Sequence, residues 1–256
     1  MSVSSSRSPR QAEIRRRTRA VVRVLEKFLG MPDAPARRPP PLAMLIATIL
    51  SQNTSDQNSH RAYTNLTRCF PSWSALAAAP PRRIRAAIRC GGMAEQKSLR
   101  IREGLHCIRE RFGGYDLSAL EGMTDREVIA ELTRIKGVGV KTAACVLLFS
   151  LGRDVFPVDT HVHRVCSRLG LVPGSRSPEE TFERMEQLVP RGKAYSFHTN
   201  LIRFGRMVCR AQTPVCGSCP LYKECIFPGR KRNHKRLRRP SKTDHRFMLL
   251  DNVGTF

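Results

Sequence analysis

Apolar residues recur along most of this chain at intervals of three and four positions, the period of an amphipathic helix. Val128, Leu132 and Ile135, for example, share one helical face just before a pair of glycines. The same periodicity predicts helices over residues 12–29, 42–51, 57–69, 80–89, 94–111, 125–135, 141–151, 160–169, 178–189 and 194–208. Because no segment shows the alternation of a strand, the predicted fold class is all-α.

Two breaks in the helical pattern predict a division into lobes. The first is the proline-rich segment 32–41 and the second is the stretch 152–157. We therefore expect a basic N-terminal arm and helix (1–41), a helical domain (42–153), a second domain (154–228) and a basic, flexible C-terminal tail (229–256). The N-terminal helix is expected to pack with the second domain. A cleft between lobes is a preferred place for a ligand.

The net charge of +24 in 256 residues indicates a polyanionic partner. Residues 1–40 hold ten Lys and Arg against three acidic residues, and residues 226–256 hold nine against two. Such segments bind phosphate without sequence preference and make affinity depend on salt. No apolar run reaches membrane-spanning length and no signal-peptide core follows the N-terminus, so we expect no membrane partner.

The segment Lys136–Lys141 carries the most specific chemistry. Gly137 and Gly139 allow a tight reversal between two helices, in which backbone N–H groups can grip a phosphate. Lys141 then falls in the first turn of the second helix, where the helix dipole and partial burial disfavour the ammonium form. A free lysine amine is a nucleophile. A glycine turn followed by a solvated surface lysine is the alternative interpretation.

Asp159 lies eighteen residues beyond Lys141, in the loop Pro157–His161. It stands where the helix over 160–169 needs an N-cap, so the aspartate also has an ordinary structural interpretation. A carboxylate and an amine from two successive helices can converge on one cleft, which favours a catalytic pair over two unrelated residues.

Four of the nine cysteines follow the pattern C-x6-C-x2-C-x5-C within seventeen residues: Cys209, Cys216, Cys219 and Cys225. Turn residues between them allow the four thiolates to surround one metal centre, either a structural zinc or a [4Fe–4S] cluster. Only Cys216 and Cys219 form a C-x2-C pair, and this asymmetric spacing favours the [4Fe–4S] cluster. With four protein ligands the cluster is expected to have a structural role. We expect the five other cysteines to be buried small residues and the compartment to be reducing.

Together these motifs resemble the endonuclease III family of helix–hairpin–helix DNA glycosylases. The resemblance covers residues 42–228 and includes the block Leu50–Asp56, the hairpin 136–143, the loop 157–161 and the cysteine quartet. It implies a two-lobed fold, with a six-helix barrel domain beside a helical domain that holds a [4Fe–4S] cluster, and duplex DNA as the partner.

The implied activity is removal of oxidised pyrimidines followed by cleavage of the abasic site. By resemblance Lys141 is the nucleophile, Asp159 stabilises the developing charge on the sugar, and the quartet binds the cluster. The residues implied to contact DNA are Gln52, Asn53, Met93, Lys136, Gly137, Val138, Gly139 and His161. Among these, Gln52 or Asn53 is the polar wedge that fills the space of an extruded base, and Met93 is either the apolar wedge or a core residue.

Two other functions remain as alternatives. A monofunctional mismatch or base glycosylase resembles this family but usually lacks a lysine at the position of Lys141. A non-catalytic DNA-binding iron–sulfur protein would need neither Lys141 nor Asp159. We expect a monomer that acts on DNA with damaged bases or abasic sites and that is cytoplasmic, associated with the nucleoid.

Overall fold

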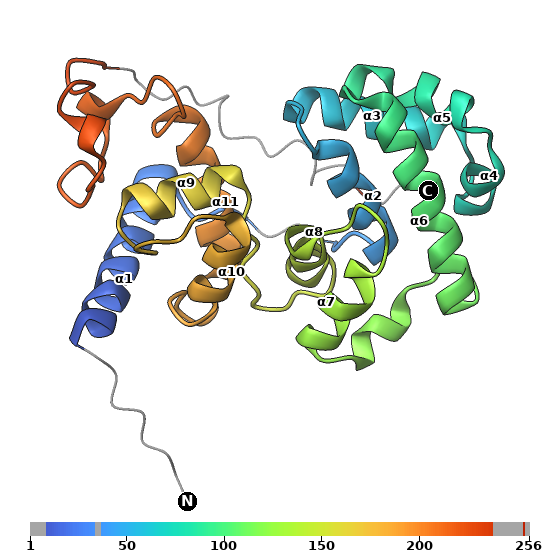
Figure 1. The fold of residues 1–256 in the computed structure, drawn as a ribbon, viewed down its shortest axis with the longest axis horizontal. Coiled ribbons are helices and arrows are strands. Elements are labelled where there is room, and N and C mark those ends of the chain that lie inside the picture. The colour runs from blue at the N-terminus through green and yellow to red at the C-terminus, as the bar shows by residue number, and fades with distance from the viewer. Residues whose placement is uncertain (1–8, 34–36, 238–252, 254–256) are drawn as a thin grey trace, which may run out of the picture. The chain divides into compact units, whose positions relative to one another are not determined.

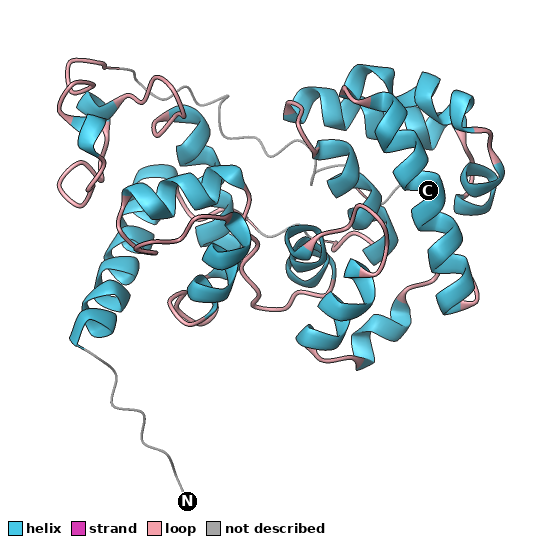
Figure 2. Cartoon of the chain, viewed as in Figure 1, coloured by secondary structure: helices cyan, strands magenta, loops and turns pink. Residues whose placement is uncertain are grey.

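The computed structural model describes residues 9–33, 37–237 and 253. These residues form helices, turns and loops, and no strand occurs among them (Figure 2), which confirms the predicted all-α class. The chain divides into two compact units, one made of residues 1–34 and 158–246 and the other of residues 35–157 and 247–256. The ends of the predicted basic arm and tail, residues 1–8, 238–252 and 254–256, lie outside the described residues.

The unit from residue 35 to 157 is built around one central helix. Its helices are α2 (Pro41–Ser51), α3 (Asp56–Cys69), α4 (Trp73–Ala78), α5 (Pro81–Ile88), α6 (Ala94–Phe112), α7 (Asp125–Thr133) and α8 (Val140–Cys145). Helix α2 packs against α3, α6 and α8 (Figure 1), and every residue from 42 to 50 is buried. A helix that is apolar all round is one that a core encloses.

The other unit joins the N-terminal helix to the last third of the chain. It contains α1 (Pro9–Leu29), α9 (Thr160–Arg168), α10 (Pro178–Glu186) and α11 (Ala194–Met207). Helix α11 packs against both α1 and α9. Its Asn200 amide donates to the carbonyl of Gly30 at 3.0 Å, which fixes the end of α1. After α11 the chain forms an irregular loop that carries the cysteine quartet.

Several helix boundaries follow from local capping. The predicted start of α10 at Ser177 is confirmed, because its hydroxyl accepts from the backbone N–H of Glu180 at 3.2 Å. Thr124 and Glu127 form a reciprocal capping box at the start of α7. Such caps satisfy N–H groups that have no partner within the helix.

The structure also differs from the sequence-based predictions in three details. Helix α4, which Ser72 caps, was not predicted, because six residues are too few to show a helical period. The helix predicted over 141–151 is α-helical only to Cys145 and continues as a π-helical turn, η3 (Val146–Ser150). Among the five other cysteines, Cys145 and Cys166 are buried as expected. Cys69, at the end of α3, is instead exposed, and Cys90 and Cys107 are only half-buried.

Among the described residues, no helix is both long enough and apolar enough to cross a membrane.

Candidate functional site

The predicted hairpin lies between α7 and α8 and depends on one glycine with a left-handed backbone. Gly137 has φ +86°, and a Cβ atom there would lie 2.8 Å from Cδ of Arg100. Both the backbone angle and the close approach of Arg100 therefore require glycine. Val138 turns inward and is buried, and its N–H donates to the carbonyl of Ile135 at 2.9 Å.

Helix α8 begins without a side-chain cap. Its N-cap residue is Gly139, whose carbonyl accepts from the N–H groups of Thr142 and Ala143. Glycine cannot cap with a side chain, so the first N–H groups of the helix can serve an anion. Lys136, 80% exposed, lies beside this turn and pairs with Glu103 at 3.3 Å. An ion pair this exposed contributes little to stability, so Lys136 can readily pair with another anion in place of Glu103.

Lys141 is the second residue of α8 and is half-buried. Within the described part of the chain its side chain forms no hydrogen bond or ion pair. Helix α8 is itself fixed by packing against α2 and α7, and the π-helical turn η3 follows it. The amine thus stands on a rigid element without a competing partner, as a nucleophile requires.

Asp159 is the N-cap of α9, as the sequence indicated. Its Oδ1 accepts from the N–H of Val162 at 2.7 Å, and the side chain is half-buried. A charged oxygen at this position satisfies a backbone donor and interacts favourably with the helix dipole. The cap therefore fixes the orientation of this carboxylate.

His161 lies in the first turn of α9, where Arg164 contacts it. Nη2 of Arg164 donates to Nδ1 of His161 at 3.0 Å. Arg164 also donates to the carbonyls of Cys209 and Gly205, which ties His161 to the start of the cysteine loop.

The cysteine quartet lines one common cavity. Cys209, Cys216, Cys219 and Cys225 all line it, together with Arg168 and Phe227. No group of three or more His, Cys, Asp or Glu among the described residues is arranged to hold a metal ion. Four thiolates around one zinc would lie about 3.8 Å apart, from Zn–S bonds of about 2.3 Å. The four thiols are therefore not placed as the ligands of a single zinc ion, although they line one common pocket.

Arg168, a residue that the sequence did not single out, organises this loop. Its guanidinium donates to the carbonyls of Arg210 and Ala211 at 2.7 and 2.8 Å and lies 3.5 Å from Sγ of Cys209. It also stacks on the ring of Phe227, at 4.1 Å from the ring centroid. One arginine thus holds both ends of a loop that has little regular structure.

The segment with Gln52 and Asn53 and the segment with Met93, which carry the candidate wedge residues, meet in the unit of residues 35–157. Asn53 and Met93 are the only non-glycine residues with positive φ among the described residues, at 50° and 51°. The amide of Asn53 lies 3.5 Å from Sδ of Met93, and both side chains are exposed. The expectation that Met93 could be a core residue is wrong, since 42% of its surface is accessible. Gln52 instead accepts from Arg100 at 3.0 Å.

Lys97 joins these two segments and was missed by the sequence analysis. It is 1% exposed, and its Nζ donates to the carbonyls of Leu50 and Gly91, both at 2.8 Å. Burial, and to a lesser extent the Arg100 guanidinium, lowers the pKa of Lys97 from its ordinary 10.5 to about 8. The sequence does contain a feature that could have revealed its burial, because Lys97 is in helical register with the apolar residues Ile101, Leu105 and Ile108.

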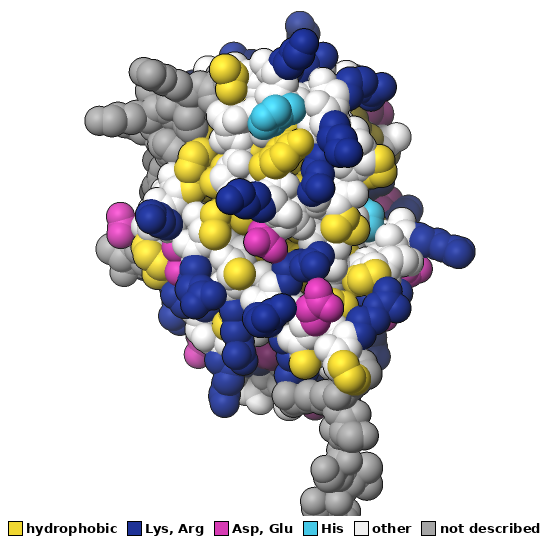
Figure 3. All heavy atoms as spheres, turned by 90° about the vertical axis from the view of Figure 1, so that its left-hand side faces the viewer, with side chains coloured by type: hydrophobic (Ala, Val, Ile, Leu, Met, Phe, Trp, Pro, Cys, Tyr) yellow, Lys and Arg dark blue, Asp and Glu magenta, His cyan; other side chains and the backbone are white. Residues whose placement is uncertain are grey.

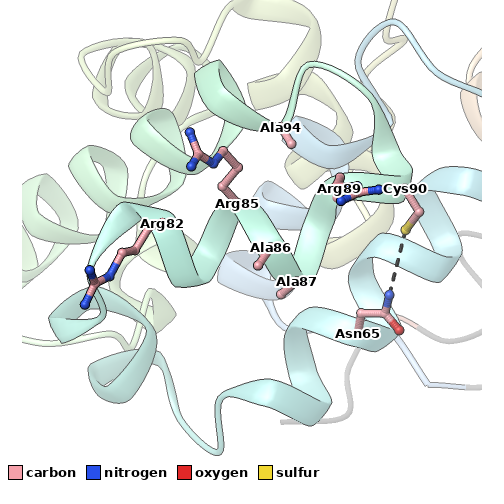
Figure 4. A pocket seen from close by; sticks show the side chains of 8 residues that line it. All are labelled: Asn65, Arg82, Arg85, Ala86, Ala87, Arg89, Cys90 and Ala94. Atoms are coloured by element: carbon pink, nitrogen blue, oxygen red, sulfur yellow. Dashed lines mark hydrogen bonds between the residues drawn. The ribbon is translucent and has the colours of Figure 1, made fainter.

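A basic pocket lies beside the Met93 segment. Figure 4 shows its lining side chains, among them Arg82 and Arg85 of α5, with Arg89 and Cys90 in the turn that follows. Arg85 pairs with Glu95. Lysine and arginine side chains are also spread over the face drawn in Figure 3, with acidic side chains scattered among them. These charges suit a phosphate backbone but carry no chemistry of their own.

Comparison with known proteins gives consistent matches. The model of the HhH-GPD superfamily base excision DNA repair protein matches residues 46–191. An endonuclease III of Thermotoga maritima is 37% identical over 75% of this chain and 85% of its own length. A protein of Arabidopsis thaliana named as a DNA glycosylase is 35% identical over 68% of this chain, which spans 57% of that relative.

The solved structure of a non-covalent endonuclease III–DNA complex has a similar fold. It superposes with a TM-score of 0.74 and 27% sequence identity, covering 86% of this chain and 99% of that one.

Proposed function

Because this chain belongs to the endonuclease III family, within the HhH-GPD superfamily of base excision DNA repair proteins, we propose that it is a bifunctional DNA glycosylase and abasic-site lyase. Membership in this family makes it a DNA glycosylase. The proposal adds that it removes oxidised pyrimidines from duplex DNA and then cleaves the strand. The residues that we assign to this function are Lys141, the hairpin and the wedge residues in the unit of residues 35–157, and Asp159 and the cysteine quartet in the other unit.

The observation that carries the proposal is the placement of Lys141. The amine stands in the first turn of α8, half-buried and without a partner among the described residues, directly after a hairpin suited to phosphate. A monofunctional glycosylase activates water and has no use for a lysine there. A lysine nucleophile instead becomes covalently attached to C1′ and makes strand cleavage possible.

The chemistry can be written with these residues. The reaction requires the free amine: Nζ of Lys141 bonds to C1′ while the glycosidic bond breaks, and the base leaves with the bonding electrons and takes up a proton. The nitrogen then loses a proton, and its lone pair expels the ring oxygen O4′, which takes up a proton, so that a protonated Schiff base forms. Removal of a proton from C2′ then expels the 3′ phosphate by β-elimination. Asp159, ionised, stabilises the positive charge that develops on the sugar.

The wedge assignment follows from the contacts within one unit. The Gln52 amide oxygen is engaged by Arg100, whereas Asn53 is exposed and touches Met93. We therefore assign Asn53 as the polar wedge and Met93 as the apolar wedge. Lys136, Gly137, Val138 and Gly139 are assigned to the phosphate backbone of the damaged strand, and His161 to a second DNA contact.

The residues of the quartet fit a [4Fe–4S] cluster, which Cys209, Cys216, Cys219 and Cys225 would hold. With four protein ligands such a cluster has no open coordination position, so it would brace the loop. Arg168 serves the same loop through its carbonyl contacts and its stacking on Phe227. Elemental analysis of purified protein should find iron and sulfide, and zinc without iron would overturn this assignment.

Borohydride trapping tests the catalytic proposal. Wild-type protein on a duplex with thymine glycol or an abasic site should give a covalent adduct, because borohydride reduces a Schiff base. Lys141→Gln should bind the same duplex, give no adduct and lose strand cleavage by a factor on the order of 10³ or more. Lys27→Gln on α1 is a matched control, since it removes an exposed amine outside the proposed site.

The outcomes separate the alternatives. Base release without an adduct in the wild type identifies a monofunctional glycosylase, and binding without either product identifies a non-catalytic DNA-binding protein. An adduct that persists in Lys141→Gln assigns the nucleophile to another residue. We propose that the protein acts as a monomer, in the cytoplasm and associated with the nucleoid, on DNA with damaged bases or abasic sites.

A further inference from the structure

The most unusual buried group in the unit of residues 35–157 is the ammonium of Lys97. Its side chain is 1% exposed, and its partners are two neutral carbonyl oxygens, those of Leu50 and Gly91. No ion pair with a carboxylate is formed by this lysine among the described residues. Burying a charge without a counter-charge is costly. An apolar side chain of the same length would avoid this cost, so the ammonium group of Lys97 must contribute something that an apolar side chain cannot.

The two carbonyls belong to segments far apart in the chain. Leu50 lies in the last turn of α2, three residues before Asn53, and Gly91 ends the short turn η1 (Arg89–Gly91), two residues before Met93. Both hydrogen bonds are 2.8 Å long. Lys97 therefore fixes the distance between the backbone at Leu50, just before Asn53, and the backbone at Gly91, just before Met93.

Asn53 and Met93 themselves are held in an unfavourable conformation. Both have left-handed backbones, which asparagine tolerates better than other non-glycine residues but which methionine adopts only where the surroundings impose it. Their side chains touch each other and are otherwise exposed, so their own packing cannot impose it. The restraint must come from the segments behind them, where Lys97 is the shared contact.

We propose that Lys97 is a positioning residue that holds Asn53 and Met93 together as one preformed wedge, ready to enter the base stack. The inference rests on the proposed function, because it needs a base to be extruded. It separates two tasks within the enzyme. Lys97 serves base extrusion, whereas Lys141 serves bond breaking.

A purely structural role makes a different prediction. Leu50 and Gly91 both lie at helix ends, and a lysine that merely caps them would affect stability and leave the wedge untouched. The experiment must therefore measure extrusion separately from folding and from the covalent chemistry.

The test compares one lesion in two settings. Thymine glycol is placed either in a fully paired duplex or in an unpaired bubble of the same sequence, where little unstacking is needed. Lys97→Met keeps the length and burial of the side chain and removes its donors. We expect this variant to process the bubble within twofold of wild type and the paired duplex at least tenfold more slowly. Equal losses on both substrates, or no loss on either, would overturn the proposal.

Leu105→Ala is the matched control. It lies on the buried face of the same helix, contacts neither carbonyl, and lowers stability by leaving a cavity. If general destabilisation explained the loss, Leu105→Ala would show the same ratio between duplex and bubble. Should Lys97→Met fail to fold, Lys97→Gln retains an amide donor, and a selective duplex defect smaller than tenfold is expected.

A double-mutant cycle and an equilibrium readout complete the test. In a Met93→Ala background, Lys97→Met should change the ratio between duplex and bubble by less than twofold, because its effect passes through the wedge. Fluorescence of 2-aminopurine opposite the lesion, measured with Lys141→Gln, should rise on binding and fail to rise when Lys97→Met is added. This fluorescence measurement needs no catalysis, so its outcome is independent of the borohydride test. A wild type without an adduct refutes the lyase assignment, and an unchanged fluorescence rise in the Lys97→Met variant refutes the role of Lys97.

Discussion

At the scale of single residues, Lys97 predicts a specific dependence of stability on pH. Its pKa is about 8 in the folded protein, against an ordinary value of 10.5 that we assign to the unfolded chain. Between these values the unfolded chain binds more protons, so the free energy of unfolding rises with pH. Across pH 7.5 to 10.5 the gain from this group is about 3 kcal/mol.

Urea denaturation of wild type and Lys97→Met across this range measures the effect. The variant lacks the titrating group, so the difference between the two free energies of unfolding should change in favour of wild type as the pH rises. If the free energies of unfolding of the two proteins changed in parallel with pH, the Lys97 amine would titrate alike in the folded and unfolded states.

At single residues, the sequence predicted the features that depend on neighbours close in the chain. Asp159 as an N-cap and Lys141 in a first helical turn follow from neighbours within a few positions, and both are found there. Lys97 could not be found in this way, because its partner carbonyl at Leu50 is 47 residues away and is a backbone atom that no sequence pattern marks. The choice between Gln52 and Asn53 likewise needed the contact with Arg100.

At the scale of elements, the hairpin depends on Gly137. Gly137→Ala would place a methyl group against Arg100 and force alanine into a left-handed backbone, which together cost about 1–2 kcal/mol. We expect that loss of stability in thermal or urea unfolding, with weaker binding to abasic DNA. Gly122→Ala is the control, because a Cβ there meets no atom and φ is not positive, so its stability should change little. Equal losses in both variants would contradict the argument.

The elements were also the most predictable level of the fold. Each predicted helix has an observed counterpart, since amphipathic periods of ten residues or more are distinct. The short helix α4 and the π-helical turn η3 were missed for opposite reasons. The first lacks length, and the second keeps the apolar pattern of an α-helix while changing its hydrogen bonds.

At the scale of the whole molecule, the net charge of +24 should dominate binding to undamaged DNA. If six or more phosphates are contacted, affinity should fall by about 10³-fold or more between 50 and 200 mM salt. Fluorescence anisotropy at several salt concentrations gives the slope directly. A slope near zero would show that the basic segments do not meet the phosphate backbone, whatever the enzyme does at the lesion.

The complete enclosure of α2 has a consequence for how DNA is engaged. A helix that is covered on every side from residue 42 to 50 can neither roll nor slide without opening the core around it. The peptide that follows it, and with it Asn53, therefore has a fixed anchor. If Asn53 enters the base stack as proposed, we expect helix α2 to keep its place while the DNA bends and opens around it.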